Sequence, residues 1–313
     1  MNVLSLFDGM SCGQIALTEL GVFPANYFAS EVDKHAIKQT QLNFPDTKQL
    51  GSVTELDGFD LPRIDLLMGG SPCQSFSFAG KRVGMVTMDN VEITDLEQYM
   101  ELKRNGFKFE GQSYLFWEYV RILTEIRLMN PDVKFLLENV KMAKKWEEVI
   151  TEALGVEPIL INSSLVSAQN RKRLYWTNIE GVTVPEDRGI LLGDVLENEV
   201  PEKYYLSERA VKGIQDKNNE RGRDEKAKCL TATVHKGPRN DGCTIVRDYK
   251  DGRNNLISPD LSDRLRRLTP TECARLQTVP EWYTWECSDT QQYKMCGNGW
   301  TVEVISHILT NLF

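Results

Sequence analysis

The sequence is poor in histidine and lacks paired cysteines, and both shortages limit the sites it can build. It holds 3 histidines, and none of its 7 cysteines belongs to a Cys-x-x-Cys pair. Structural zinc is bound by closely spaced Cys and His ligands, so we expect no metal site. The cysteine count is odd and the spacings form no regular framework. This pattern predicts reduced thiols and argues against a secreted disulfide scaffold.

A long hydrophobic run is also missing. No stretch approaches the roughly 20 apolar residues that span a bilayer, so we expect no membrane segment. The N-terminal stretch MNVLSLFDG is too short and too acidic for a signal peptide, which favours a cytoplasmic location. With 313 residues, 41% of them apolar, the chain can bury a core and is expected to divide into one large and one small domain.

The chain has no overall excess of positive charge, although a protein that handles nucleic acid needs Lys and Arg for the phosphates. Its net charge is −8. Residues 203–255, however, hold 13 Lys or Arg against 8 Asp or Glu, a local charge of +5 that leaves −13 for the remainder. Any one of these charges is ordinarily a solvated surface group. A basic region on an acidic body still fits a one-sided clamp on DNA.

Short apolar runs alternate with helical patterns in the first 180 residues. Residues 2–7, 26–30, 48–50, 64–68 and 133–137 are predicted strands, and residues 113–129 and 142–154 are predicted helices, the first with Ser113 as its N-cap. Two further runs, 158–162 and 174–177, are expected to form a closing hairpin. This order predicts an α/β fold with a doubly wound, mostly parallel sheet. Residues 180–261 lose the alternation and predict a second, smaller domain.

A cysteine follows the fourth predicted strand. Gly69 and Gly70 introduce a turn, and Pro72 precedes Cys73. The carboxyl edge of an open α/β sheet is where such folds bind ligands, and a thiolate in a loop there can act as a nucleophile. On these residues alone, Cys73 is either that nucleophile or a small buried hydrophobe, as most free cysteines are.

A turn of small residues, Asp-Gly-Met-Ser-Cys-Gly, joins the first predicted strand to a helix. Gly9 and Gly13 let the backbone approach a ligand and point helix N–H groups at it, although they do not complete a dinucleotide-binding fingerprint. After the second strand, Glu31 is placed to accept the ribose hydroxyls of a cofactor. Its alternative role is a charge at the N-terminus of the next helix.

Several motifs stand in a fixed order along the chain. FDGMSCG is followed by the Pro-Cys-Gln of residues 72–74, by Glu138-Asn139-Val140 and by QNRKR at residues 169–173; TPTECARLQ and GNGWTV complete the set. In this order they resemble the cytosine-C5 DNA methyltransferases of bacterial or phage type. The resemblance runs from residue 2 to the C-terminus, apart from a variable gap between about residues 179 and 260.

This resemblance implies a Rossmann-like methyltransferase fold with a separate target-recognition domain. Residues 1–179 are then the catalytic and cofactor-binding domain, 180–261 the target-recognition domain, and 262–313 the return to the catalytic domain. The implied reaction transfers a methyl group from S-adenosylmethionine to C5 of a cytosine flipped out of double-stranded DNA, as in restriction-modification systems. We expect a monomer that needs no metal.

The resemblance also assigns catalytic roles. Cys73 is implied to add to C6 of the base and Glu138 to protonate N3. Arg173 matches the arginine that grips the base carbonyl, and Arg171 matches its partner nearer the nucleophile. The alternatives are an exposed or capping role for Glu138 and a surface basic cluster for the two arginines.

A cofactor site is implied by the same resemblance, with two departures from the family pattern. Val32 stands where many relatives carry an aromatic residue, and Ser52 stands where relatives often present an aspartate to the adenine. Leu115 is equally a core residue. The residues implied to bind S-adenosylmethionine are Phe7, Asp8, Gly9, Met10, Gly13, Glu31, Val32, Ser52, Val53, Gly70, Pro72, Leu115, Asn298, Trp300 and Thr301.

Two segments are expected to contact DNA. Residues 80–111 are too long for a plain connection and are predicted to form a mobile lid with a small helix within residues 89–103. In the second domain, residues 228–233 and 242–246 are predicted to be strands of a hairpin whose polar loop suits base edges and phosphates. The residues expected to bind DNA are Ser77, Lys81, Arg82, Thr231, His235, Lys236 and Arg239.

Two other functions fit parts of the sequence. A relative in the same family methylates cytosine in transfer RNA, but its Cys-Phe-Thr signature is absent here and Ser71 replaces its usual proline before Pro-Cys. A catalytically silent DNA-binding relative should have lost Cys73, Glu138 or Arg173, and all three are present.

Overall fold

A computed structural model describes residues 1–72, 85, 87, 91–109, 111–207, 210–211, 219–236, 243–248 and 264–313. The chain divides into two compact units. The first comprises Met1–Ile161, Lys172–Val184 and Ile305–Phe313, and the second comprises Asn162–Arg171 and Pro185–Val304. Five residues of the predicted sites lie outside the described residues: Cys73, Ser77, Lys81, Arg82 and Arg239.

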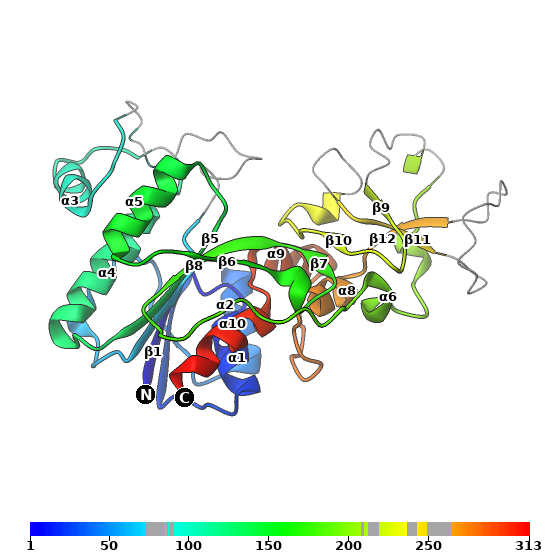
Figure 1. The fold of residues 1–313 in the computed structure, drawn as a ribbon, viewed down its shortest axis with the longest axis horizontal. Helices are drawn as coiled ribbons and strands as arrows, with labels where there is room; N and C mark the ends of the chain where they lie inside the picture. The colour runs from blue at the N-terminus through cyan, green and yellow to red at the C-terminus, as the bar shows by residue number, and fades with distance from the viewer. Residues whose placement is uncertain are drawn as a thin grey trace. The chain divides into compact units, whose positions relative to one another are not determined.

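The first unit is built on a twisted sheet, which within the described residues has the strand order β3-β2-β1-β4-β5-β8-β6 (Figure 1). Its strands are β1 (Asn2–Leu6), β2 (Asn26–Ser30), β3 (Lys48–Gln49), β4 (Leu66–Gly69), β5 (Lys134–Val140), β6 (Ile159–Asn162) and β8 (Lys172–Thr177). The pairs from β3 to β5 are parallel, and β5 and β8 are antiparallel. The predicted doubly wound, mostly parallel sheet is confirmed.

The strand order reverses between β1 and β4. The chain moves outward from β1 through β2 to β3, then returns to the other side of β1 at β4 and moves outward again to β5. In open α/β sheets, ligands bind beyond the carboxyl ends of the strands at this reversal. The segments that leave β1 and β4 at that edge begin at Phe7 and Gly70.

Helices cover the sheet on both faces, with α4 and α5 on one side and α1 and α2 on the other (Figure 1). Their bounds are α1 (Cys12–Glu19), α2 (Lys34–Asn43), α4 (Leu115–Met129) and α5 (Lys144–Leu154). Helix α5 shows why they pack: Trp146, Ile150 and Leu154 recur every fourth residue and are all buried. They join one core with α4 and with the inward side chains of the strands.

Some predicted details of the first unit are wrong. Helix α4 begins at Leu115 after an N-cap Tyr114 that makes no side-chain cap, and Ser113 is buried instead of capping. Glu138 lies within β5, opposite Tyr175 of β8, because the antiparallel pairing carries the strand on to Val140.

The segment after the Cys73 loop holds α3 (Leu96–Arg104), close to the predicted helix. Ile93 and Tyr99 are buried in the same core as α4, and the Tyr99 ring lies 5.1 Å from that of Phe109. Residues 91–109 thus contain the predicted helix and pack on the first unit. The lid role predicted for residues 80–111 stays a prediction.

The second unit contains short strands and helices. Its described strands are β7 (Gln169–Asn170), β9 (Glu220–Arg221), β10 (Ala227–Lys228), β11 (Ile245–Asp248) and β12 (Arg264–Arg267). Its described α-helices are α6 (Leu192–Val195), α8 (Pro270–Leu276) and α9 (Asp289–Asn298), and α10 (Val302–Leu309) leads from this unit into the first.

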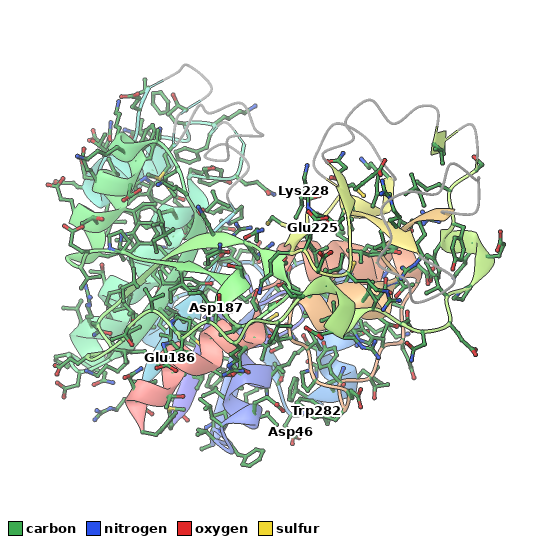
Figure 2. All side chains as sticks on the ribbon, turned by 45° about the vertical axis from the view of Figure 1, so that its right-hand side comes forward. Asp46, Glu186, Asp187, Glu225, Lys228 and Trp282 are labelled. Carbon is green, nitrogen blue, oxygen red and sulfur yellow. The ribbon has the colours of Figure 1, made fainter. Side chains whose placement is uncertain are left out.

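The predicted hairpin of the second domain is wrong. Strand β10 pairs in parallel with β7, and β11 pairs with β12 and β9. The Lys228 N–H, instead of entering a ladder with β11, donates to the Thr244 hydroxyl at 2.9 Å (Lys228 is labelled in Figure 2). Residues 234–236 form a 3-10 turn. The partner of β10 is thus β7, 58 residues earlier in the chain, and not the next strand in sequence.

Helix α8 begins as its Thr-Pro-x-Glu sequence predicts. The Thr269 hydroxyl accepts from the Glu272 N–H, and the Glu272 carboxylate accepts from the Thr269 N–H, which makes a capping box with Pro270 in the first turn. Glu272 also forms an ion pair with Arg266 at 2.8 Å, and both side chains are fully buried. This ion pair thus ties α8 to β12 in the interior of the second unit.

Candidate functional site

The turn after β1 has an unusual backbone. Phe7, Gly9 and Ser11 all have positive φ angles, of 58°, 60° and 66°. The N–H groups of Phe7 and Asp8 both donate to the carbonyl of Ser30 at the end of β2, at 2.8 and 3.3 Å. The turn is therefore tied to the neighbouring strand end, and left-handed backbone held in this way is typical of functional turns.

Close packing beneath this turn explains a glycine. A Cβ atom on Gly13 would lie 2.6 Å from the Met68 Cε of β4. Helix α1 begins here, and its N-cap Ser11 makes no side-chain cap. The Ser11 side chain therefore does not cap α1, and the N-terminus of a helix is where the carboxylate of a ligand can bind.

Glu31, at the end of β2, is held facing this turn. Its Oε2 accepts from the Gly9 N–H at 2.8 Å, and its Oε1 accepts from the N–H groups of Val32 and Asp33 at 2.7 and 2.8 Å. A carboxylate offers about four acceptor positions, so hydroxyl groups can still donate to it. The side chain that caps α2 is Asp33, which accepts from His35 at 2.9 Å. The two roles predicted for Glu31, a ligand of the ribose and a charge at the N-terminus of α2, both stay predictions.

Asp8 is a buried carboxyl in the same turn. Its Oδ1 accepts from the Tyr27 hydroxyl at 2.9 Å, and among the described residues its Oδ2 has no partner at hydrogen-bonding distance. Burial raises the pKa of Asp8 to about 6, although the hydroxyls of Ser5, Ser11 and Tyr27 oppose that rise; the charge of Glu31 adds to it. A buried carboxylate oxygen without a donor suits a cationic or N–H group of a bound ligand.

Replacing Asp8 with asparagine is expected to change how stability depends on pH. A folded-state pKa of about 6 against 3.8 means that the Asp8 contribution is favourable below pH 4 and is lost as pH rises through 6. At neutral pH the loss corresponds to about 3 kcal/mol. In thermal melts without ligand, the melting temperature of Asp8→Asn relative to wild type should therefore rise between pH 4 and pH 7. A difference that stays constant over this range would contradict the assignment.

The other side of the predicted cofactor site is the segment after β3. Val53 is buried, Val32 is 72% exposed and Leu115 is half-buried against the core. The Ser52 hydroxyl lies 2.8 Å from that of Thr54. Gly70 and Pro72, at the exit of β4, are half-buried. The cofactor contacts of these residues stay predictions.

Glu138 and Arg173, two of the predicted catalytic residues, lie together. The Arg173 Nε lies 2.8 Å from the Glu138 Oε1, and the two side chains are 14% and 11% exposed. The antiparallel register of β5 and β8 produces this contact, because it sets Arg173 opposite Val140, two residues beyond Glu138. An arginine in this position orients the carboxyl group and fixes one of its oxygens.

Asn139 is a site residue that the sequence analysis did not assign. Its Nδ2 donates to the Ser71 hydroxyl at 3.0 Å and to the Ser71 carbonyl at 3.4 Å, and both residues are buried. Leu137 of β5 stands opposite Gly69 of β4. The exit of β4, two residues before Cys73 in the sequence, is thus tied to the strand that carries Glu138.

The structure places the remaining predicted residues in the second unit. Arg171 is buried, and its guanidinium donates to the carbonyls of Leu230, Gly297 and Gly299 at 3.0, 3.3 and 2.9 Å. These contacts give Arg171 a structural role that the sequence did not reveal, and its catalytic role stays a prediction. Trp300 and Thr301 are buried, Asn298 and Lys236 are exposed, and Thr231 is half-buried.

Within the described part of the chain, no group of three or more His, Cys, Asp or Glu side chains could hold a metal ion. The helices in the same residues are all too short or too polar to cross a membrane.

Taken together, the sheet reversal, the left-handed turn and the fixed Glu31 define a Rossmann-like unit, with a Glu-Arg pair close to the same edge. Solved structures share this fold. The DNMT2 protein of Spodoptera frugiperda superposes with a TM-score of 0.73 and 21% identity over 100% of this chain and 99% of its own. A putative DNA modification methyltransferase from an E. coli prophage gives 0.59 and 20%, over 100% and 98%.

Sequence comparison identifies the family. The family model of the C-5 cytosine-specific DNA methylases matches residues 1–313. The chain is 32% identical over 302 residues to the type II methyltransferase M1.ScrFI of Lactococcus lactis subsp. cremoris, covering 90% of this chain and 70% of that protein. It is 29% identical over 333 residues to M.NlaX of Neisseria lactamica, covering 98% and 94%.

The chain therefore belongs to the C-5 cytosine-specific DNA methylase family. It is a DNA (cytosine-5-)-methyltransferase, as its sequence motifs predict. Family and fold together imply that S-adenosylmethionine is the methyl donor and DNA the substrate.

Proposed function

We propose that the enzyme methylates C5 of a flipped-out cytosine within a specific DNA sequence, through a covalent bond between Cys73 and C6 of the base. The observation that carries this proposal is the Glu138–Arg173 pair on β5 and β8, beside the exit of β4 that leads to Cys73. A cytosine inside a duplex cannot be reached from above its ring, so the base must leave the stack at a cost of a few kcal/mol.

Three residues act on the base, each in a different role. The Cys73 thiolate forms the bond to C6, and Glu138 gives a proton to N3, which makes C5 nucleophilic. Arg173 holds the Glu138 carboxyl through Oε1, and it would also bind the base carbonyl. Bound S-adenosylmethionine supplies the methyl group to C5. Loss of the C5 proton to a base then breaks the bond between Cys73 and C6, and N3 returns its proton to Glu138, which leaves 5-methylcytosine and the Cys73 thiolate.

The first unit offers a fitting place for the methyl donor. Glu31 would accept the ribose hydroxyls, since its carboxylate is already fixed by three N–H groups and keeps acceptor positions. The Asp8 Oδ2 and the open N-terminus of α1 would hold the amino and carboxylate groups of its methionine part. Val53 and Ser52 would lie against the adenine, with Val32 as a looser, exposed wall.

DNA contacts are proposed for residues of the first unit and for residues of the second. Ser77, Lys81 and Arg82 would act next to the nucleophile. Thr231, His235, Lys236 and Arg239 would read the sequence; Lys236 is exposed at the end of the 3-10 turn. This region is the basic part of the chain, as expected for phosphate contacts.

Bisulfite sequencing tests the proposal. The gene is expressed in a host without cytosine methylation, and DNA and transfer RNA from the same cells are treated with bisulfite. We expect conversion-resistant cytosines in DNA within one short fixed context, and none above background with Cys73→Ser. Resistant cytosines confined to transfer RNA, or none in either polymer, would contradict the proposal.

A further inference from the structure

A buried carboxylate on α4 links α3 to an arginine that binds the segment after β3. Glu118 is fully buried. Its Oε1 accepts from the Tyr99 hydroxyl and from the Lys103 Nζ, both on α3, and its Oε2 accepts from the Arg121 Nε at 2.7 Å. Burial alone would raise the pKa of Glu118, but hydrogen bonds from Lys103 and Tyr99 and the charge of Arg121 lower it below its usual value. The carboxylate is therefore held ionised by these three donors.

Arg121 carries this network to the segment after β3. Its Nη2 donates to the carbonyls of Val53 and Leu56 at 3.0 and 2.8 Å, and its Nη1 donates to the Glu125 Oε1 at 2.8 Å. The Glu125 Oε2 in turn accepts from the Gly58 N–H at 2.8 Å. One arginine and one glutamate of α4 thus hold the backbone of residues 53–58.

Arg121 binds the buried Glu118 carboxylate and the backbone carbonyls of Val53 and Leu56 at the same time. The Arg121 side chain is 11% exposed, so its guanidinium has little access to water as an alternative acceptor. A Cβ on Gly58 would lie 2.8 Å from the Glu125 Cβ, so the segment sits directly on α4. Because Glu118 is shared by α3 and Arg121, a donor lost on α3 leaves a buried charge under-satisfied, and the remaining donors must shift toward it.

We propose that Arg121 is a positioning residue for the cofactor site, and that residues 91–109 set the affinity for the cofactor through Tyr99, Glu118 and Arg121. Arg121 acts through the backbone of Val53, the residue assigned above to the adenine wall, so the inference rests on the proposed function. Residues 91–109, which follow the Cys73 loop in the sequence, then influence the affinity for the methyl donor without contacting the donor.

The test uses Tyr99→Phe, which removes one hydrogen bond to Glu118 and keeps the ring that packs on Phe109. Binding of S-adenosylhomocysteine is measured by calorimetry, and methylation is measured at saturating S-adenosylmethionine. We expect the Kd to rise by about fivefold to tenfold, which is less than the full effect of a lost hydrogen bond to a charged group because only part of it reaches the cofactor site, while kcat stays within about twofold. Arg121→Lys should raise the Kd at least as much, because a lysine cannot reach both carbonyls.

Lys145→Ala is the matched control. Lys145 on α5 forms an ion pair with Glu92 and so also holds residues 91–109 in place, but it has no contact with Glu118 or Arg121. Its Kd should equal that of wild type. Hydrogen exchange of residues 53–58 gives a readout that does not depend on ligand, and it should accelerate in Tyr99→Phe but not in Lys145→Ala.

The outcomes separate the possible failures. Unchanged Kd and unchanged exchange in Tyr99→Phe, even with a lower melting temperature, would overturn the inference and leave the network a purely structural one. An equal rise of Kd in Lys145→Ala would also overturn it. Any loss of a contact that holds residues 91–109 would then raise the Kd, whether or not it involves Glu118 and Arg121. If wild type itself did not bind S-adenosylhomocysteine, the proposed function would fail instead.

Discussion

Glu138→Gln is expected to slow methylation about a hundredfold or more, the contribution of a well-placed general acid. Glutamine has nearly the same shape, so β5 and its pairing with β8 should remain, but an amide has no acidic proton to give to N3 of the base. The measurement is single-turnover methylation of duplex DNA at saturating cofactor, compared with the affinity for S-adenosylhomocysteine. The affinity should stay within about twofold, because Glu138 belongs to the β5–β8 pair and not to the Glu31 turn.

The control is Glu148→Gln. Glu148 lies on α5, where it pairs with Lys144 at 3.5 Å and is 65% exposed. This variant removes a carboxylate of the same unit that takes no part in the chemistry, and its rate should equal that of wild type. A Glu138→Gln enzyme that methylates as fast as the control would remove Glu138 from the mechanism.

Cys73→Ser is expected to abolish a covalent adduct that the wild-type enzyme forms with a modified base. The bond between Cys73 and C6 normally breaks when the C5 hydrogen is lost, and fluorine cannot leave in that way. Duplex DNA with 5-fluorocytosine at the target should therefore trap wild type in a complex that survives denaturing electrophoresis when S-adenosylmethionine is present. A serine hydroxyl without a strong base beside it is a poor nucleophile, so no adduct should form.

Two other cysteines serve as controls for this experiment. Cys12 and Cys296 are buried, at 3% and 0% exposure, and neither follows a proline in a loop after a strand. Cys12→Ser and Cys296→Ser should both still be trapped. An adduct that maps by mass spectrometry to a cysteine other than Cys73 would overturn the covalent route.

The sheet could be predicted because its signal is local. A strand of a parallel sheet is covered on both faces, and β1, β2 and β4 accordingly read as short apolar runs in the sequence. The second unit gives no such signal. Strands β7 and β10 have two residues each, and their pairing joins Gln169 to Ala227, so nothing near either strand indicates its partner. The expected hairpin failed for this reason.

The site was only partly predictable for a related reason. Motif order assigned Glu138 and Arg173, and the antiparallel register brings them together. The contacts of Arg171 with the carbonyls of Leu230, Gly297 and Gly299 depend on the folded path of two distant segments. The bond from Asn139 to Ser71 likewise depends on the spacing of two neighbouring strands. Side-chain identity alone does not reveal contacts of this kind.

The division of the first unit into three chain segments has a consequence for biosynthesis. Its last segment, Ile305–Phe313, is separated from the previous one by residues 185–304 of the second unit. At about 5–20 residues per second, a ribosome needs roughly 6–24 s to cross that interval. Until then the nascent chain lacks Ile305, Ile308 and Leu309, which are fully buried in the finished fold, and Ser306, whose hydroxyl donates to the Ala16 carbonyl of α1. During this interval α1, the helix that follows the turn of residues 7–11, lacks its contact with the last segment. Apolar side chains that this segment would bury are then exposed, and a chaperone could bind them.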